Sequence, residues 1–172
     1  MPERAMHDRH RLVPDDFDVP DVLEHPQFRL RMLSVNDLIK DYDAAMSSVE
    51  HLRATYSPES GGSWPEGLTI EDDLVDLGWH QHEFKHRSSF AYTVMTPSED
   101  RCLGCVYIKP TRKRGHDCKV MMWVRADALA SGLDEELYRT VRTWIADIWP
   151  FANPAFPGRA VSFEAWHALP SE

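Results

Sequence analysis

The sequence is poor in the residues that build fibres, disulfide scaffolds and membrane spans. Its 172 residues include only 8 glycines and 3 cysteines, which excludes a collagen-like repeat and a disulfide-dense scaffold. No apolar run approaches the roughly 20 residues of a membrane-spanning helix, and the charged first 20 residues lack the apolar centre of a secretory signal. The odd number of cysteines is typical of a reducing compartment. We therefore expect a cytoplasmic protein with no membrane association.

Positive charge is also scarce. The chain has 19 Lys and Arg against 28 Asp and Glu, a formal net charge of -9. A protein that binds nucleic acid non-specifically needs a positive surface, so we expect no nucleic-acid partner. Hydrophobic residues make up 42% of the chain, enough for the core of one domain.

The spacing of apolar residues predicts one α+β domain over 28–172, preceded by an irregular, proline-containing arm over 1–27. Expected strands are 28–33, 89–96, 102–109, 118–124 and 159–163, and expected helices are 36–52, 69–86 and 133–149. The strands from 89 to 124 form an antiparallel meander. Because 120–124 is apolar on both faces, we expect an interior strand with helices on each side of the sheet.

The amino-acid sequence of this meander resembles that of a known protein family. Phe90–Val94 and Leu103–Ile108 are similar to the central hairpin of the Gcn5-related N-acetyltransferase (GNAT) superfamily, whose second strand often begins with an aliphatic–glycine pair. Val120–Val124 followed by Leu137–Val141 resembles the strand and helix beside that family's acyl-CoA site. The resemblance covers about 28–164. It implies a layered α/β/α, mixed and mostly antiparallel sheet, and transfer of an acyl group from acetyl-CoA to an amine.

The resemblance also implies where the cofactor would bind. In the family, Gln/Arg-x-x-Gly-x-Gly/Ala at a helix N-terminus binds the CoA pyrophosphate through backbone N–H groups. An ungapped alignment puts Leu129, Gly132 and Asp134 at the signature positions, so one of three matches; Arg125-x-x-Ala128-x-Ala130 is a looser match. The implied cofactor-binding residues are Trp123, Val124, Arg125, Ser131, Gly132 and Tyr138.

Three acids fill the first turn of the same helix: Asp134, Glu135 and Glu136. They favour the helix dipole, and we expect them to cap its free N–H groups, but they place negative charge where a pyrophosphate would bind.

A transferase also needs a group that accepts the proton of the amine. By position the candidates are Glu164, Glu50 and His51. The family continues past its fifth strand with a helix and two strands, whereas here only 165–172 remain after the part that the resemblance covers, and no tyrosine follows Tyr138 to serve as the usual acid. The shortened sheet would leave an edge, so we expect a homodimer. The acceptor, a small molecule or another substrate, stays open.

Two alternatives remain. The chain is a catalytically inactive GNAT-fold module that binds a ligand or associates with itself, or it is a zinc hydrolase through His82-Glu83-x-x-His86. Helical spacing places both histidines away from the apolar stripe, so we expect no metal. Cys102 and Cys105 should point to opposite faces of a regular strand, too far apart to share a metal ion.

Overall fold

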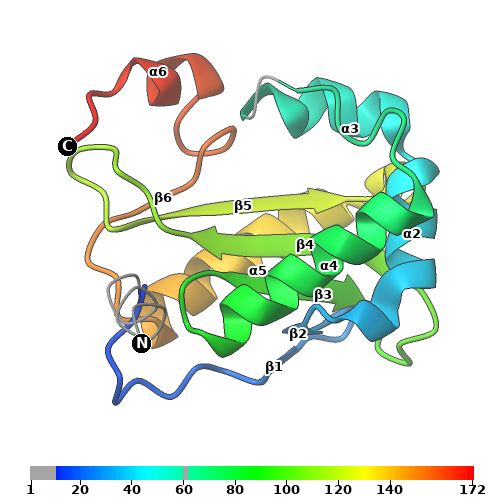
Figure 1. Cartoon of the computed structure of the whole chain (residues 1–172), viewed down its shortest axis with the longest axis horizontal. Helices are drawn as coiled ribbons and strands as arrows, with labels where there is room; N and C mark the ends of the chain where they lie inside the picture. Colours follow the sequence, from blue (N-terminus) through cyan, green and yellow to red (C-terminus); the bar gives the residue numbers. More distant parts are fainter. Residues whose placement is uncertain (1–10, 60–61) are drawn as a thin grey trace.

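The computed structural model describes residues 11–59 and 62–172, in which helices cover a six-stranded sheet (Figure 1). The strands are β1 (Val22–Glu24), β2 (Arg29–Met32), β3 (Phe90–Met95), β4 (Cys102–Lys109), β5 (Cys118–Val124) and β6 (Pro154–Ala155). The α-helices are α2 (Leu38–Met46), α3 (Val49–Thr55), α4 (Ile70–Lys85), α5 (Leu133–Ile148) and α6 (Phe163–Ala168), with 3₁₀ turns η2 (Val35–Asp37), η3 (Ser57–Glu59) and η4 (Ala126–Ser131). In this part of the chain, no helix has the length and apolar character needed to cross a membrane.

The strands lie in the sheet in the order of the chain, from β1 to β6. Every neighbouring pair is antiparallel except β5 and β6, which run parallel. All residues of β3 are buried, and only Lys119 in β5 is not fully buried. The expected meander is therefore confirmed, as are the burial of 120–124 on both faces and the mixed, mostly antiparallel sheet with helices on both faces.

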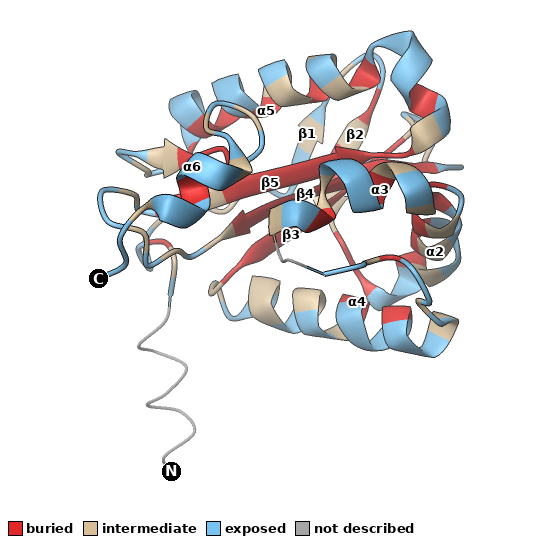
Figure 2. Ribbon diagram, turned by 90° about the horizontal axis from the view of Figure 1, so that it is seen from above, coloured by how far each residue is buried: buried red, intermediate tan, exposed pale blue. Residues whose placement is uncertain are grey.

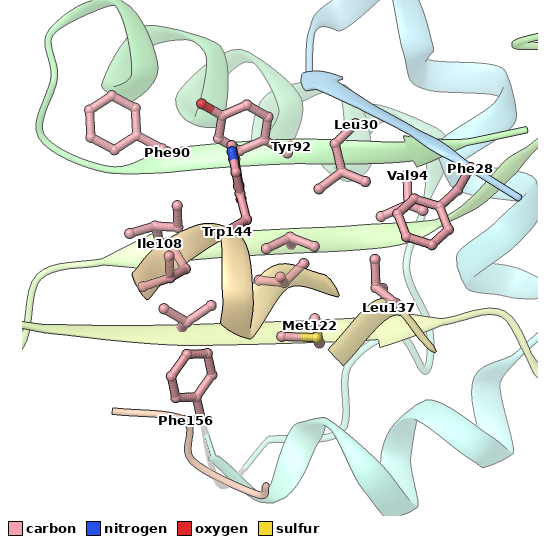
Figure 3. Close-up of a cluster of buried hydrophobic side chains, with 14 of the residues drawn as sticks. Phe28, Leu30, Phe90, Tyr92, Val94, Ile108, Met122, Leu137, Trp144 and Phe156 are labelled. Carbon is pink, nitrogen blue, oxygen red and sulfur yellow. The ribbon is translucent and has the colours of Figure 1, made fainter. Parts of the chain in front are cut away.

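Helix α5 covers one face of the sheet, and α2 and α4 lie against the other (Figure 2). On the α5 face, Leu137 and Trp144 pack among sheet residues such as Tyr92, Ile108 and Met122 (Figure 3). These side chains recur at the three- and four-residue spacing that predicted the helix. On the other face, small residues of α2 and Leu77 of α4 pack on the strands.

The helix expected over 36–52 is two helices. Ser34 caps the 3₁₀ turn η2 that leads into α2, in a capping box with the Asp37 carboxylate. The break falls at Ser47 and Ser48, whose hydroxyls bind the turn that follows β5: Ser48 Oγ accepts from the backbone N–H of Ala126 at 2.8 Å. Tertiary hydrogen bonds thus end α2, a signal that helical periodicity does not contain.

The two ends of the described chain differ from expectation. Val22–Glu24, placed in the irregular arm, pairs with β2 as an edge strand, whereas 11–21 contains no helix or strand and 1–10 lies outside the described residues. The strand expected over 159–163 is wrong. The sixth strand is the shorter β6, after which the chain turns at Gly158, with a φ of 78°. Ser162 then caps the unexpected helix α6.

A β-bulge changes which face of the sheet the first side chains of β4 point to. Its register with β3 shifts at Val94 and Met95, so Leu103 packs on the α5 face while Cys102 and Cys105 both lie on the α2/α4 face. The expectation that the two thiols point to opposite faces is therefore wrong, because an extra residue resets the alternation.

Candidate functional site

The second half of β5 has a backbone edge that no strand of the described chain covers. β6 pairs with β5 only at Cys118 and Lys119. The backbone N–H of Arg125 donates to the carbonyl oxygen of Leu103 in β4. In an extended strand, the backbone N–H and C=O groups of every second residue point to the same side. The backbone of Met122 and Val124 therefore points to the uncovered edge.

The side chain of Arg159 lies on this edge. Its Nη2 donates to the carbonyl oxygen of Met122 at 3.3 Å, and its guanidinium forms a two-pronged ion pair with Asp134, at 2.6 Å and 2.8 Å. The guanidinium carbon is 5.5 Å from the ring centre of Tyr138. Bidentate, charge-assisted pairs of this kind are among the stronger hydrogen bonds in proteins. Arg159 thus ties the segment after β6 to β5 and to the first turn of α5.

The turn between β5 and α5 contains two of the predicted cofactor residues. Gly132 has a φ of 76°, in the left-handed region that favours glycine. Ser131 is exposed and its hydroxyl donates to the carbonyl oxygen of Ala128 at 2.7 Å. The glycine is explained by this backbone turn alone, without a ligand.

Two of the three acids of the α5 first turn form ion pairs within the protein. Asp134 pairs with Arg159, and Glu136 lies 3.0 Å from the ring nitrogen of His25 and also pairs with Arg139, which lowers the pKa of Glu136. Within the described chain no side chain caps the N-terminus of α5, so the expectation that these acids cap it is wrong. They act through ion pairs and through the helix dipole.

Arg125, another predicted cofactor residue, is used inside the protein. It is 3% exposed and its guanidinium bonds to Asp43 of α2 at 3.1 Å, to Asp127 of η4 at 2.8 Å and to the carbonyl oxygen of Cys102 at 3.1 Å. A buried guanidinium with these partners anchors α2 to the end of β5, and it is not free to bind a ligand without breaking them.

The remaining cofactor candidates lie at the same end of the sheet on different faces. Trp123 points to the α2/α4 face, where its Nε1 donates to the hydroxyl of Tyr107 at 3.2 Å. Val124 belongs to the apolar core beneath α5. Tyr138 is half-buried, with its ring edge-on to Phe156 at 5.7 Å between ring centres.

The three predicted proton acceptors lie on two other helices. Glu50 and His51 are on α3, and Glu164 is the second residue of α6. Figure 1 shows both helices. Both glutamates are exposed and His51 is half-buried. No hydrogen bond or ion pair within 11–59 and 62–172 joins Glu164 to either of the others.

The histidines of the zinc-hydrolase alternative lie on the exposed side of α4. His82 and His86 are 4.0 Å apart between ring centres, and His86 Nδ1 contacts the carbonyl oxygen of His82 at 2.8 Å. In the described part of the chain no group of three or more His, Cys, Asp or Glu side chains could hold a metal ion. This geometry gives the hydrolase alternative no support.

Sequence patterns missed the residues that matter most in this architecture. Arg159 was assigned to a strand, and its partners lie 25 and 37 residues away. Asp41 and Asp73 are both buried, at 4% and 2% exposure. A signal for them exists: Asp41 precedes the buried Ala45 by four residues and Asp73 precedes the buried Leu77 by four, which puts each acid on an apolar helix stripe.

Comparisons with known proteins agree on the fold. No protein-family model and no curated protein sequence matches the chain. Solved structures do. The ribosomal-protein-S5-alanine acetyltransferase from Vibrio fischeri has a TM-score of 0.58 and 17% identity over 74% of this chain and 67% of that one. The ribosomal L7/L12 α-N-protein acetyltransferase RimL, in complex with coenzyme A, has a TM-score of 0.58 and 10% identity, and the match covers 73% of this chain and 67% of that one. An acetyltransferase of the GNAT family from Bacillus anthracis has a TM-score of 0.50 and 15% identity, and the match covers 73% of this chain and 67% of that one.

These likenesses show that the chain has the acetyltransferase-like fold of the GNAT superfamily, as its sequence resemblance implied. At such identities they show the fold and leave the chemistry to the residues of this chain. Those residues fit a pyrophosphate poorly. Three acids stand at the N-terminus of α5, and Arg159 lies on the edge of β5 beside them, already paired with Asp134.

Proposed function

We propose that this chain is a GNAT-fold protein that does not catalyse acyl transfer and acts as a ligand-binding module. The observation that carries this proposal is the contact of Arg159 with both the Met122 carbonyl and the Asp134 carboxylate. An acyl-CoA arm bound by the backbone of Trp123–Arg125, as the resemblance implies, would run along the edge of β5, where this guanidinium lies. A pyrophosphate at the N-terminus of α5 would also meet the carboxylates there, which cancels the attraction of the helix dipole for an anion.

Thermal denaturation with acetyl-CoA tests this proposal. We expect about 1 mM acetyl-CoA to change the melting temperature of the wild-type protein by less than about 0.5 °C, because a ligand that does not occupy its site does not stabilise the folded state. A rise of several degrees that Gly132→Glu abolishes would contradict the proposal. Arg142→Ala is the matched control, because it removes an exposed arginine from the same helix, farther from its acidic first turn.

An acyl-CoA-dependent N-acetyltransferase is the second candidate, and the uncovered edge at Met122 and Val124 favours it. In this case Arg159 would leave Asp134 to admit the cofactor, whose binding would involve the backbone of Trp123–Arg125, the turn at Ser131 and Gly132, and Tyr138. Glu164, Glu50 or His51 would accept the proton of the amine. Release of free CoA thiol from acetyl-CoA, followed over a panel of amines, distinguishes the candidates. Release by the wild type that requires an amine supports the transferase.

The expected homodimer is likewise untested. Light scattering coupled to size exclusion measures it directly: a mass near 40 kDa, twice the 19.9 kDa of one chain, would support it.

A further inference from the structure

A cavity of about 590 Å³ lies where β4 ends and β5 begins. Both strands and α4 contribute to its wall, and the lining includes Lys109, Lys119, Asp76, Trp79 and Glu83. A volume of this size accommodates a small organic molecule. The uncovered edge of β5 and Arg159 are not part of this lining, so the cavity needs an explanation of its own.

Two lysines oppose each other across the strands at this cavity. Lys109 of β4 and Lys119 of β5 are direct partners in the antiparallel register, so their side chains leave the same face of the sheet. Like charges in directly opposed positions of a strand pair repel each other. This repulsion makes it costly for both side chains to remain charged unless an acid compensates them.

The two lysines differ in their partners. The Nζ of Lys119 forms an ion pair with Glu59 Oε1. The Nζ of Lys109 forms no hydrogen bond or ion pair within 11–59 and 62–172, and it lies 4.9 Å from the ring centre of Tyr107. A ring face attracts a cation, but it does not accept strong charge-assisted hydrogen bonds as a carboxylate does. Lys109 is therefore the less compensated of the two.

The surroundings of Lys109 favour its neutral form. The side chain is half-buried, and burial together with the positive charge of Lys119 lowers the pKa of Lys109. Glu59 and the two acids of α4 that line the cavity act in the opposite direction without reversing this effect. A neutral lysine amine is a nucleophile, and enzymes obtain one by burial or by placing a second cation beside it.

The rest of the lining indicates what kind of molecule would meet this amine. Besides Lys109, its charged side chains are two bases and two acids, Arg11, Lys119, Asp76 and Glu83. Burial lowers the pKa of His80, which also lines the cavity, to about 4, so its ring is neutral at pH 7. Because these charges balance, the lining favours an uncharged ligand. The exposed ring of Trp79 offers such a ligand an aromatic surface for packing.

We propose that Lys109, with Lys119 opposed to it, forms an imine with small uncharged aldehydes that enter this cavity. The lone pair of Lys109 Nζ attacks the carbonyl carbon, and the C=O double bond becomes a single bond as the C–N bond forms. The resulting carbinolamine loses water, which takes the oxygen of the aldehyde and the two hydrogens of the amine and leaves a C=N bond. No oxidant or reductant is needed. The reaction involves neither acyl transfer nor CoA, so the proposal stands or falls separately from the proposed function.

Reductive trapping with benzaldehyde and sodium cyanoborohydride tests the proposal. The reductant converts an imine to a stable secondary amine, which mass spectrometry of peptides assigns to one lysine. At pH 7 and limiting benzaldehyde, we expect Lys109 to be modified about tenfold faster than Lys85, because a pKa lower by one raises the neutral fraction of an amine about tenfold. Lys85 is the matched control, since it is an exposed lysine of α4 that does not line the cavity.

Two variants test the part played by the opposed charge. Lys119→Gln removes the positive charge beside Lys109, so the pKa of Lys109 should rise and its modification at pH 7 should slow by about threefold or more. Lys119→Arg keeps a positive charge at the same position and should leave the rate at Lys109 within about twofold.

Three outcomes would overturn the proposal. They are equal rates at Lys109 and Lys85 in the wild type, preferential modification of a lysine outside the cavity, and an unchanged rate at Lys109 in Lys119→Gln. If Lys119→Gln were misfolded by circular dichroism, the comparison of Lys109 with Lys85 in the wild-type protein would decide alone.

Discussion

The two faces of the sheet are built differently although they share the same strands. The α5 face is an apolar core with phenylalanine, leucine and tryptophan side chains interdigitated (Figure 3). The α2/α4 face also has an apolar cluster, but it includes two cysteines and borders a cavity with two buried aspartates. Burial of two acids is costly for a face that only stabilises a fold, since apolar residues of similar size pack there at lower cost. The difference is that the α5 face is packed with apolar side chains, whereas the α2/α4 face carries buried charge-bearing groups beside a cavity.

The largest effect should come from the α5 face. Leu137 is fully buried there, and Leu137→Ala removes packed methyl groups and leaves a void, so we expect a loss of about 3 kcal/mol in the free energy of unfolding. Urea denaturation measures it. Leu74→Ala on the outer side of α4, where the leucine is 43% exposed, is the control and should cost far less. Equal losses would contradict the division of labour between the faces.

The α2/α4 face should respond to pH. Because folding raises the pKa of Asp73, the folded protein binds more protons than the unfolded chain from about pH 4 upward, and this carboxyl group therefore lowers the free energy of unfolding as pH rises. Asp73→Asn removes that contribution. We expect the variant to be more stable than the wild type at pH 8, by roughly 1–2 kcal/mol, with the difference shrinking toward pH 4.

The wild type and Asp73→Asn must be compared because His80 changes the free energy of unfolding with pH in the opposite direction to Asp73. The lowered pKa of His80 makes the folded state bind fewer protons below about pH 6.5, so its contribution to stability grows with pH in that range. This contribution is shared by wild type and variant and cancels in the difference. Urea denaturation of both proteins at about pH 4, 6 and 8 measures how the difference in the free energy of unfolding depends on pH. A difference independent of pH would show that the Asp73 carboxyl group is ionised throughout.

The smallest of these effects belongs to Arg159, which ties the segment after β6 to β5 and to the first turn of α5. Arg159→Ala removes an ion pair whose side chains are 20% and 32% exposed, so solvent weakens it, and we expect a loss of about 1 kcal/mol. Arg159→Lys should recover only part of this, because an ammonium cannot reproduce the two-pronged geometry. Thermal denaturation suffices as the measurement. A loss in Arg159→Ala as large as that of Leu137→Ala would mean that Arg159 belongs to the core.

Much of the fold was predictable because its signals are local. The spacing of Leu137, Val141 and Trp144 predicts α5, and the β-branched and aromatic runs predict β3, β4 and β5. The aliphatic–glycine pair also has a physical reason: a Cβ on Gly104 would lie 2.0 Å from the carbonyl oxygen of Trp123, so only glycine allows β4 and β5 to approach. These features concern neighbours along the chain or a single pair of strands.

The candidate sites were predicted less well. Burial of Arg125 depends on Asp43, 82 residues away, and the Asp41–Cys105 contact spans 64 residues. The bulge at Val94 and Met95 then brings Cys102 to the same face as Cys105. No local period encodes which acid meets which base across the sheet.

The amino-acid sequence by itself determined strands β2 to β5, the main helices and the resemblance to the GNAT fold, because burial of an apolar stripe depends on residue spacing. The tertiary structure decided that Arg159 lies on the edge of β5 and that Asp41 and Asp73 share a cavity. These placements depend on how distant segments pack, since charged groups take whichever partners the folded backbone brings within a few ångströms.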